Sequence, residues 1–294
     1  MNDLKRVAIV GGVHGNELLG VYLVKKFQQY PHLVKRNGFE VITLLANPQA
    51  AKLNRRYIDL DLNRCFALED LNNNKLIYHE QNLAKKIVRQ LQAQRIDFLI
   101  DIHTSTANMG ITLLLSNLLP FNLKLIAYLL SLDPTIKVVY FQNNREENRL
   151  RNICNLGFTL EIGSIPHGTL DSIWFQKTEK LINNILNYLD LLNNDFTSDR
   201  SISLTQTIPL YKVTVPINFP VDEAGQLTAM IHPTLLGKDY CELAPKQPIF
   251  LKFDDSNIVY QGSQIVYPIF INESAYQEYS IAMYLTTKQI INCP

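Results

Sequence analysis

Short apolar runs alternate with amphipathic segments over the first two thirds of the chain. Runs rich in β-branched and other large apolar residues predict strands at Val7–Val10, Glu40–Leu45, Phe98–Ile102, Ile111–Leu115, Val138–Phe141 and Phe158–Ile162. Apolar residues at helical spacing predict helices over Glu17–Tyr30, Lys75–Leu91, Leu123–Leu132 and Leu170–Leu192. Because strands that alternate with helices build mostly parallel sheets, we expect an α/β fold with helices flanking a mostly parallel, mixed sheet.

The pattern changes at about residue 196. Asp195–Ser201 is a polar connector, and the short β-like runs beyond it are interrupted by proline and glycine, at Ile208–Val215, Pro248–Phe253 and Ile265–Ile271. This pattern is typical of a smaller β-rich domain. We therefore predict two domains, residues 1–197 and residues 198–294, and expect the second to cover the active site of the first.

Polar residues follow the predicted strands at the points where the strands end. In an open parallel sheet, reactive groups gather beyond these carboxyl ends. His14 and Glu17 stand three positions apart after the first strand, and His103 directly follows the third. Two histidines and one glutamate, with a fourth position open to water, form a recurrent catalytic zinc site. We predict that these three residues bind one Zn²⁺ per chain. Asp101, two positions before His103, can orient a ligand histidine.

A single carboxylate interrupts the apolar strand at Phe158–Ile162. Burying Glu161 there is unfavourable unless the group is protonated or finds a partner. One possible partner is an arginine in a salt bridge. The other is a water activated by the metal, from which glutamate takes a proton as general base. Once the zinc set is accepted, we favour the second interpretation.

A cluster of arginines lies between the second predicted strand and the helix at Lys75–Leu91. Arg55–Arg64 contains three arginines, one asparagine and two aspartates. Such a run is usually a solvated loop. However, a zinc site of this kind also needs a group to stabilise the developing oxyanion and an anchor for a substrate carboxylate. The rigid guanidinium fork suits both roles better than the ammonium group of lysine.

The composition of the chain limits the classes of molecule that we expect it to bind. The chain has 294 residues, 47% hydrophobic and 19% charged, and a formal net charge of +1. Nucleic acids and anionic membranes require a sustained basic excess, so we expect neither as a partner. The four cysteines form no CxxC pair, and no apolar run approaches the length of a membrane span. We expect a cytoplasmic protein with a small anionic substrate, and a homo-oligomer is compatible with the sequence.

Several motifs together resemble the aspartoacylase family, which is related to the succinylglutamate desuccinylases and the zinc carboxypeptidases. They run in the family's order over nearly the whole chain: GGVHGNE (11–17), ANPQA (46–50), RYIDLDLNRCF (56–66), DIHTSTANMG (101–110), GFTLEIG (157–163) and YPIFINESAYQE (267–278). The resemblance implies a zinc-carboxypeptidase-like fold and hydrolysis of an N-acyl-L-amino acid. N-acetyl-L-aspartate is the favoured substrate.

The resemblance also implies a role for each matching residue. His14, Glu17 and His103 would bind zinc, Glu161 would be the catalytic base, and Arg56 would polarise the acyl carbonyl. The substrate carboxylates would be held by Asn63, Arg64, Arg151 and Tyr276. Supporting roles in the site loops and at the domain interface would fall to Asn47, Asp61 and Glu273.

Two departures from the family pattern bear on the substrate. Glu147 stands where the aspartoacylases carry a tyrosine, and His167 stands where they commonly carry glutamine. The alternatives are therefore an aminoacylase for N-acetylated aromatic or neutral amino acids, or a succinylglutamate desuccinylase. A non-catalytic binding relative is disfavoured by the intact zinc set with Glu161. A zinc peptidase would need an open cleft.

Overall fold

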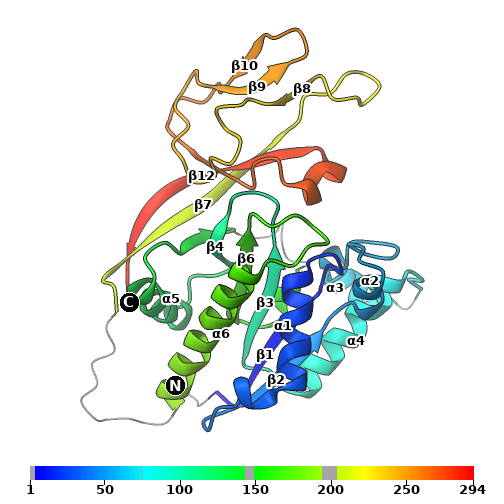
Figure 1. Cartoon of the computed structure of the whole chain (residues 1–294), viewed down its shortest axis with the longest axis vertical. Helices are drawn as coiled ribbons and strands as arrows, with labels where there is room; N and C mark the ends of the chain where they lie inside the picture. The colour runs from blue at the N-terminus through cyan, green and yellow to red at the C-terminus, as the bar shows by residue number, and fades with distance from the viewer. Residues whose placement is uncertain (1–3, 74, 143–148, 194–203) are drawn as a thin grey trace.

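The structure is a computed structural model that describes residues 4–73, 75–142, 149–193 and 204–294. Its centre is a nine-stranded mixed sheet with the order β11-β12-β7-β5-β4-β6-β3-β1-β2 (Figure 1). The strands are β1 (Arg6–Gly11), β2 (Glu40–Leu45), β3 (Phe98–Thr104), β4 (Gly110–Leu115), β5 (Lys137–Tyr140), β6 (Leu156–Gly163), β7 (Thr207–Asn218), β11 (Tyr267–Ile269) and β12 (Ile281–Asn292). The pairs β4–β6, β7–β12 and β11–β12 are antiparallel, and the others are parallel.

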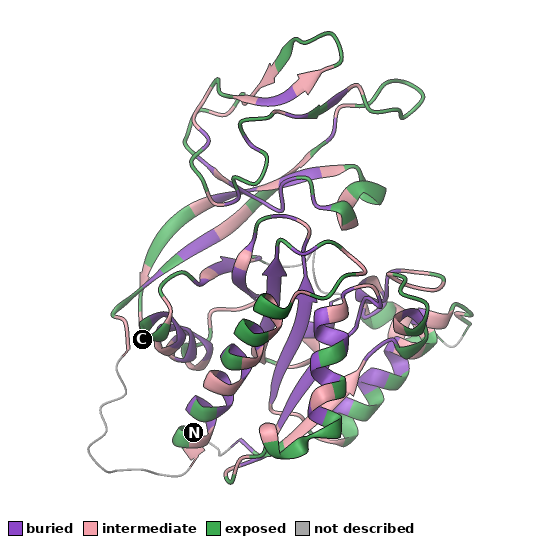
Figure 2. Cartoon of the chain, viewed as in Figure 1, coloured by how far each residue is buried: buried purple, intermediate pink, exposed green. Residues whose placement is uncertain are grey.

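The helices cover both faces of this sheet. They are α1 (Leu18–Gln29), α2 (Pro48–Lys52), α3 (Leu68–Asn72), α4 (His79–Ala93), α5 (Pro120–Leu132) and α6 (Ser172–Asn193). Short 3₁₀ turns are η1 (Pro31–Leu33), η2 (Leu62–Arg64), η3 (Leu150–Ile153) and η4 (Ser274–Tyr279). The helices have buried inner faces and exposed outer faces, whereas the central strands are buried throughout (Figure 2). This distribution is the one that their apolar spacing predicts.

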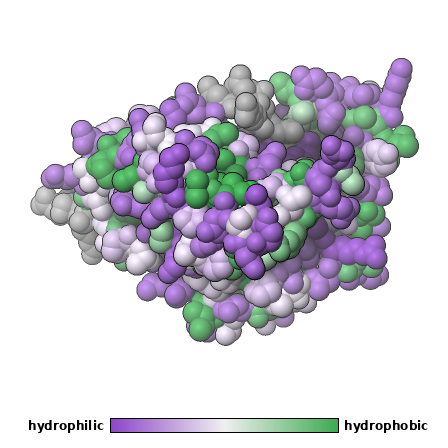
Figure 3. Space-filling model, turned by 90° about the horizontal axis from the view of Figure 1, so that it is seen from above, coloured by the Kyte–Doolittle hydropathy of each residue, from purple (hydrophilic) through white to green (hydrophobic). Residues whose placement is uncertain are grey.

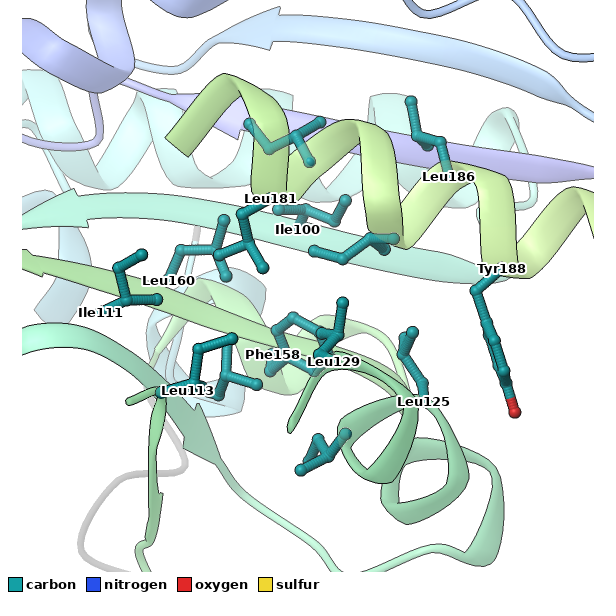
Figure 4. Packing of buried hydrophobic residues seen from close by; sticks show 14 of the residues in the cluster. Ile100, Ile111, Leu113, Leu125, Leu129, Phe158, Leu160, Leu181, Leu186 and Tyr188 are labelled. Atoms are coloured by element: carbon teal, nitrogen blue, oxygen red, sulfur yellow. The ribbon is translucent and has the colours of Figure 1, made fainter. Parts of the chain in front are cut away.

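Alternate residues of each central strand enter two different cores. On β1, Val7 and Ile9 pack with α1, α5 and α6, whereas Ala8 and Val10 pack with α4. Figure 4 shows the first core, in which side chains of β3, β4 and β6 meet those of α5 and α6. Since the side chains of a strand alternate between the faces, His103 and Glu161 both point to the face that α4 covers.

The C-terminal part has two roles. A three-stranded sheet of β8 (Ala229–Ile231), β9 (Pro248–Lys252) and β10 (Asn257–Val259) has its own apolar core and projects away from the main body (Figure 1). The long strands β7 and β12 instead extend the main sheet, because β7 pairs with β5. Seen from the end that carries β8–β10, the surface is mostly hydrophilic with scattered hydrophobic patches (Figure 3).

The predicted α/β fold with a β-rich C-terminal part is confirmed, but several details differ. Helix α4 begins at His79 rather than Lys75, because its first amide is capped from a distant loop, by Asp59 Oδ2 at 2.8 Å. We did not predict β12, whose first half is largely buried and whose last five residues, Lys288–Asn292, are mostly exposed. The predicted domain boundary at 197/198 and the connector Asp195–Ser201 lie outside the described residues. Within those residues, none of the helices has the length and apolarity needed to cross a bilayer.

Candidate metal centre and active site

The loop between β1 and α1 presents two of the predicted ligands. His14 lies in this loop and Glu17 immediately precedes α1. The loop packs tightly against α2, since a Cβ on Gly15 would lie 2.1 Å from the backbone carbon of Ala50. Only glycine permits this approach. The Gly15 amide also donates to the Arg56 carbonyl at 3.1 Å, which joins the loop to the arginine cluster.

His14, Glu17 and His103 converge, and their potential ligand atoms all lie within 4.8 Å of one another. His14 Nδ1 is 2.6 Å from Glu17 Oε1, and His103 Nδ1 is 3.0 Å from Glu17 Oε2. The two Nδ1 atoms are 3.2 Å apart. All three side chains are almost completely buried. The described residues thus form one buried His-Glu-His group that could hold a metal ion.

The chemistry of this donor set fits a divalent cation. The outer nitrogens face carboxylates, with His14 Nε2 at 3.0 Å from Asp61 Oδ1 and His103 Nε2 at 3.0 Å from Asp101 Oδ2. If each outer nitrogen donates its proton there, both inner Nδ1 atoms present lone pairs to one point, beside the Glu17 carboxylate.

The net charge of these residues also favours a divalent cation. The cluster formed by the two histidines and their direct partners contains three buried carboxylates, Glu17, Asp61 and Asp101, and the guanidinium of Arg56, which pairs with Glu17 and Asp61. With neutral imidazoles the cluster carries a net charge of about −2, which a bound divalent cation would neutralise. Burial lowers the pKa of His103, but Asp101 and Glu17 outweigh it and hold that pKa well above its ordinary value. The group therefore attracts positive charge.

Glu161 lies beside His103 in the parallel β3–β6 pair. Its side chain is 8% exposed and lines the same cavity as the three convergent residues. Burial raises the pKa of Glu161 well above its ordinary value against the opposing effect of His103, and the charges of Glu17 and Glu273 add to this rise. The alternative partner that we considered, an arginine in a salt bridge, is absent among the described residues, in which Arg56 pairs with Glu17 and Asp61.

Arg56 is held at the edge of the group by two carboxylates. Its Nη1 is 3.3 Å from Glu17 Oε1, and its Nη2 is 3.0 Å from Asp61 Oδ2. Burial lowers the pKa of Arg56, but Asp61 and Glu17 outweigh it and hold that pKa above its ordinary value, so the guanidinium is permanently charged. Its Nε is buried and has no hydrogen-bond partner among the described residues. This N–H remains available to an oxygen acceptor.

These residues surround a small cavity of about 40 Å³. Its lining combines polar and apolar side chains from both parts of the chain: His14, Glu17, Arg56, Asn63, His103, Thr104, Leu114, Phe141, Arg149, Arg151, Thr159, Glu161, Phe270, Glu273, Ala275 and Tyr276. The last four come from the segment around η4. The C-terminal part therefore contributes one wall of this small chamber.

The predicted substrate residues divide between two cavities. Asn63, Arg151 and Tyr276 line the small chamber. Arg64 does not, and instead lines an adjoining cavity of about 260 Å³ that shares Phe141 and Arg149 with the chamber. There the Arg64 guanidinium carbon lies 5.1 Å from the centre of the Tyr279 ring.

Of the two residues that depart from the family pattern, the structure describes only one. Glu147 lies outside the described residues. His167 is 3.1 Å from Ser274 Oγ through Nδ1, and its Nε2 is 3.7 Å from Glu273 Oε1. It thus contacts the start of η4 rather than the chamber itself.

The supporting residues make extensive contacts. Glu273 accepts hydrogen bonds from the Ser105 hydroxyl and from the amides of Thr106, Ala107 and Ala275, so it fastens η4 to the loop after His103. Asn47 caps α2 by accepting from the Ala50 amide at 3.1 Å.

The sequence analysis missed two residues of the site. Arg149 lines both cavities, but a lone arginine in a polar stretch gives no signal. Glu80 is fully buried and accepts from the amides of Ile58, Asp59 and Leu60 and from the Asn47 side chain, at 2.7 to 3.1 Å. It fixes the backbone between Arg56 and Asp61. Within the helix that we predicted over Lys75–Leu91, one acidic residue gave no signal of this role.

Known proteins resemble the chain over its full length. Residues 3–189 match the succinylglutamate desuccinylase/aspartoacylase catalytic domain, and residues 206–288 match the AstE/AspA barrel-sandwich hybrid domain. A probable aspartoacylase of Trichodesmium erythraeum is 45% identical over 99% of both sequences. The human N-acyl-aromatic-L-amino acid amidohydrolase is 34% identical, over 99% of this chain and 93% of that protein. The crystal structure of murine aminoacylase 3 has a TM-score of 0.93 at 32% identity, covering 100% of this chain and 98% of the other.

Proposed function

Because the chain belongs to the succinylglutamate desuccinylase/aspartoacylase family, we propose that it hydrolyses N-acetyl-L-aspartate to acetate and L-aspartate in a zinc-dependent reaction. One observation carries this proposal. The chamber combines a donor set suited to a divalent cation, a buried glutamate and several guanidinium groups. An anionic amide substrate matches that combination.

In this proposal His14, Glu17 and His103 hold the zinc. When bound, zinc supplies Lewis acidity, which makes water a stronger acid and a carbonyl a better electrophile. Asp61 and Asp101 keep the outer nitrogens of the two histidines protonated, and so keep the inner nitrogens free to bind the metal.

In this proposal Glu161 transfers a proton from water to the leaving amine. Its carboxylate accepts a proton from the attacking water, and the resulting carboxylic acid delivers it to the leaving amine nitrogen. The raised pKa of Glu161, caused first by burial, favours the first half of this transfer, because a more basic carboxylate takes a proton from water more readily. Its position beside His103 lets it reach a water in the chamber.

Arg56 stabilises the negative charge that develops on the acyl oxygen. Its anchors, Glu17 and Asp61, fix the guanidinium before the substrate arrives, so little reorganisation is needed during the reaction. Its buried Nε–H, which lacks a partner among the described residues, is the donor that an oxyanion can accept from.

The substrate carboxylates are read by Asn63, Arg151 and Tyr276 in the chamber and by Arg64 at the adjoining cavity. The small volume of the chamber, to which η4 contributes a wall, favours a small substrate over a peptide. A cytoplasmic location and a possible homo-oligomer stay predictions.

The second candidate is an aminoacylase for N-acetylated aromatic or neutral amino acids. The adjoining cavity of about 260 Å³ favours it, because Phe141, Tyr279 and Tyr284 offer aromatic walls to a larger side chain. The similarity to the human amidohydrolase, whose name specifies N-acyl-aromatic amino acids, also supports it.

A substrate panel separates the two candidates. We expect the metal-loaded enzyme to have a higher kcat/KM for N-acetyl-L-aspartate than for N-acetyl-L-asparagine, N-acetyl-L-phenylalanine or N-succinyl-L-glutamate. A preference for N-acetyl-L-phenylalanine would replace the leading assignment with the aminoacylase. No turnover of any of them by a metal-loaded protein would identify a non-catalytic binding relative.

A further inference from the structure

A serine at the end of β4 joins two residues of η3. Ser116 Oγ lies 2.9 Å from Arg151 Nε and 2.5 Å from Asn152 Oδ1. The amide oxygen of Asn152 can only accept, so the single hydroxyl proton of Ser116 is donated to it. The lone pairs of Ser116 Oγ then accept the Arg151 Nε–H. The hydrogen bonds therefore run in one direction, from Arg151 through Ser116 to Asn152.

A second contact restricts the same guanidinium. The Arg151 guanidinium carbon lies 5.3 Å from the centre of the Phe141 ring, and the residue is only 7% exposed. A guanidinium can bind a carboxylate through its terminal edge, formed by both Nη atoms, or through the edge that includes Nε. The hydrogen bond to Ser116 engages Nε, so Ser116 helps to fix the direction of the guanidinium plane at the chamber.

We propose that Ser116 is a positioning residue for substrate specificity: it fixes the Arg151 guanidinium in the wall of the chamber, where that group meets the side-chain carboxylate of the substrate. The proposal rests on the proposed function, in which Arg151 reads that carboxylate. Phe141, which lies over Arg151, lines the chamber and its neighbouring cavity, so the position of the guanidinium also determines where the substrate side chain lies between them.

The test compares two substrates of almost equal shape. N-acetyl-L-aspartate carries a side-chain carboxylate, and N-acetyl-L-asparagine replaces it with a neutral amide. Ser116→Ala removes the acceptor for Arg151 Nε and lets the guanidinium turn. We expect kcat/KM for N-acetyl-L-aspartate to fall about tenfold, equivalent to about 1.4 kcal/mol, mainly through KM. The value for N-acetyl-L-asparagine should change less than twofold.

Two further variants test whether the effect of Ser116→Ala comes from the loss of this particular hydroxyl. Ser116→Thr keeps the hydroxyl and should restore most of the selectivity. Ser131→Ala is the matched control, because the Ser131 hydroxyl bonds the Tyr128 carbonyl on the surface of α5, away from the chamber. Ser131→Ala should leave kcat/KM unchanged for both substrates. Zinc content and melting temperature of each variant are measured to separate selectivity from folding.

Arg151→Ala distinguishes the failure of this proposal from failure of the proposed function. If Arg151→Ala selectively impairs N-acetyl-L-aspartate while Ser116→Ala does not, the role of Ser116 is refuted and that of Arg151 survives. Equal losses for both substrates in Ser116→Ala would reduce Ser116 to a structural residue. Equal losses in Arg151→Ala would contradict the carboxylate pocket itself, and the proposal for Ser116 with it. If Ser116 acts through Arg151, the double variant Ser116→Ala/Arg151→Ala should have the same kcat/KM for N-acetyl-L-aspartate as Arg151→Ala alone.

Discussion

Asp61 Oδ1 lies 3.0 Å from His14 Nε2, and this contact joins the arginine cluster to the candidate metal centre. The other oxygen of the same carboxylate accepts from Arg56 Nη2 at 3.0 Å. Burial raises the pKa of Asp61, but His14 and Arg56 outweigh it and hold that pKa far below its ordinary value. One ionised carboxylate thus orients both a candidate metal ligand and the candidate electrophile.

We predict that Asp61→Asn weakens metal binding and turnover together. The neutral amide cannot support both the His14 imidazole and the Arg56 guanidinium. Replacing a residue that hydrogen-bonds to a metal-binding histidine typically lowers the metal affinity or the activity by about 10- to 100-fold. Zinc affinity is measured by competition with a chelator. Asp59→Asn is the matched control, because Asp59 belongs to the same loop but only caps α4. Equal zinc affinity in the Asp61 and Asp59 variants would show that the contact with His14 has no such role.

Glu161→Gln tests the proton carrier. Glutamine keeps the shape of the side chain but cannot accept the proton from water, so kcat should fall by about 10²- to 10⁴-fold. Zinc content should remain normal, since Glu161 is not among the three convergent residues. A variant that keeps more than a tenth of the wild-type rate would remove Glu161 from the mechanism.

Glu80→Gln tests the support beneath the arginine cluster. The variant replaces one carboxylate oxygen with an NH₂ group, which cannot accept from the backbone amides of Ile58, Asp59 or Leu60. We expect the free energy of unfolding to fall by about 1 to 3 kcal/mol, and kcat to fall because Arg56 loses its fixed position. Urea unfolding and steady-state kinetics measure the two effects. The control is Glu69→Gln on the first turn of α3. If the Glu80 variant unfolds like that control, the buried carboxylate contributes nothing.

Stability should also depend on pH through Asp239. Burial raises the pKa of Asp239 to about 6, although the amides of Ile271 and Asn108 oppose the shift. For an acid with a raised folded-state pKa, the stabilising contribution is present below the unfolded pKa of about 3.9 and is lost as the pH rises through about 6. The melting temperature of the wild type, relative to Asp239→Asn, should therefore decrease between pH 5 and pH 7.5. A constant difference across that range would contradict this assignment.

The sequence predicted those features that depend on local order along the chain. The strands that carry the site were recognisable from their apolar runs, and the carboxyl ends of β1, β3 and β6 brought His14, Glu17, His103 and Glu161 together as parallel strands must. The contact between Asp101 and His103 followed from their spacing on one face of β3.

Other features depend on contacts between distant segments and left no local signal. Glu80 acts on a loop about 20 residues away, and Ser116 meets Arg151 from 35 residues away. The separation of Arg64 from the chamber depends on where η4 places Tyr279. Likewise, β12 contains polar residues that a sheet edge tolerates, so its pairing with β7 was not visible in its composition.

The central claim is that His14, Glu17 and His103 hold one zinc ion that is required for N-acyl amino acid hydrolysis. The most direct measurement is the zinc content of purified wild-type protein and of His103→Ala, together with acetate release from N-acetyl-L-aspartate. His232→Ala, which alters a half-buried histidine of the C-terminal part, is the control. We predict about one zinc per chain and full activity in the wild type and the control, and neither metal nor activity in His103→Ala. Stoichiometric zinc in His103→Ala would contradict the assignment of the metal centre.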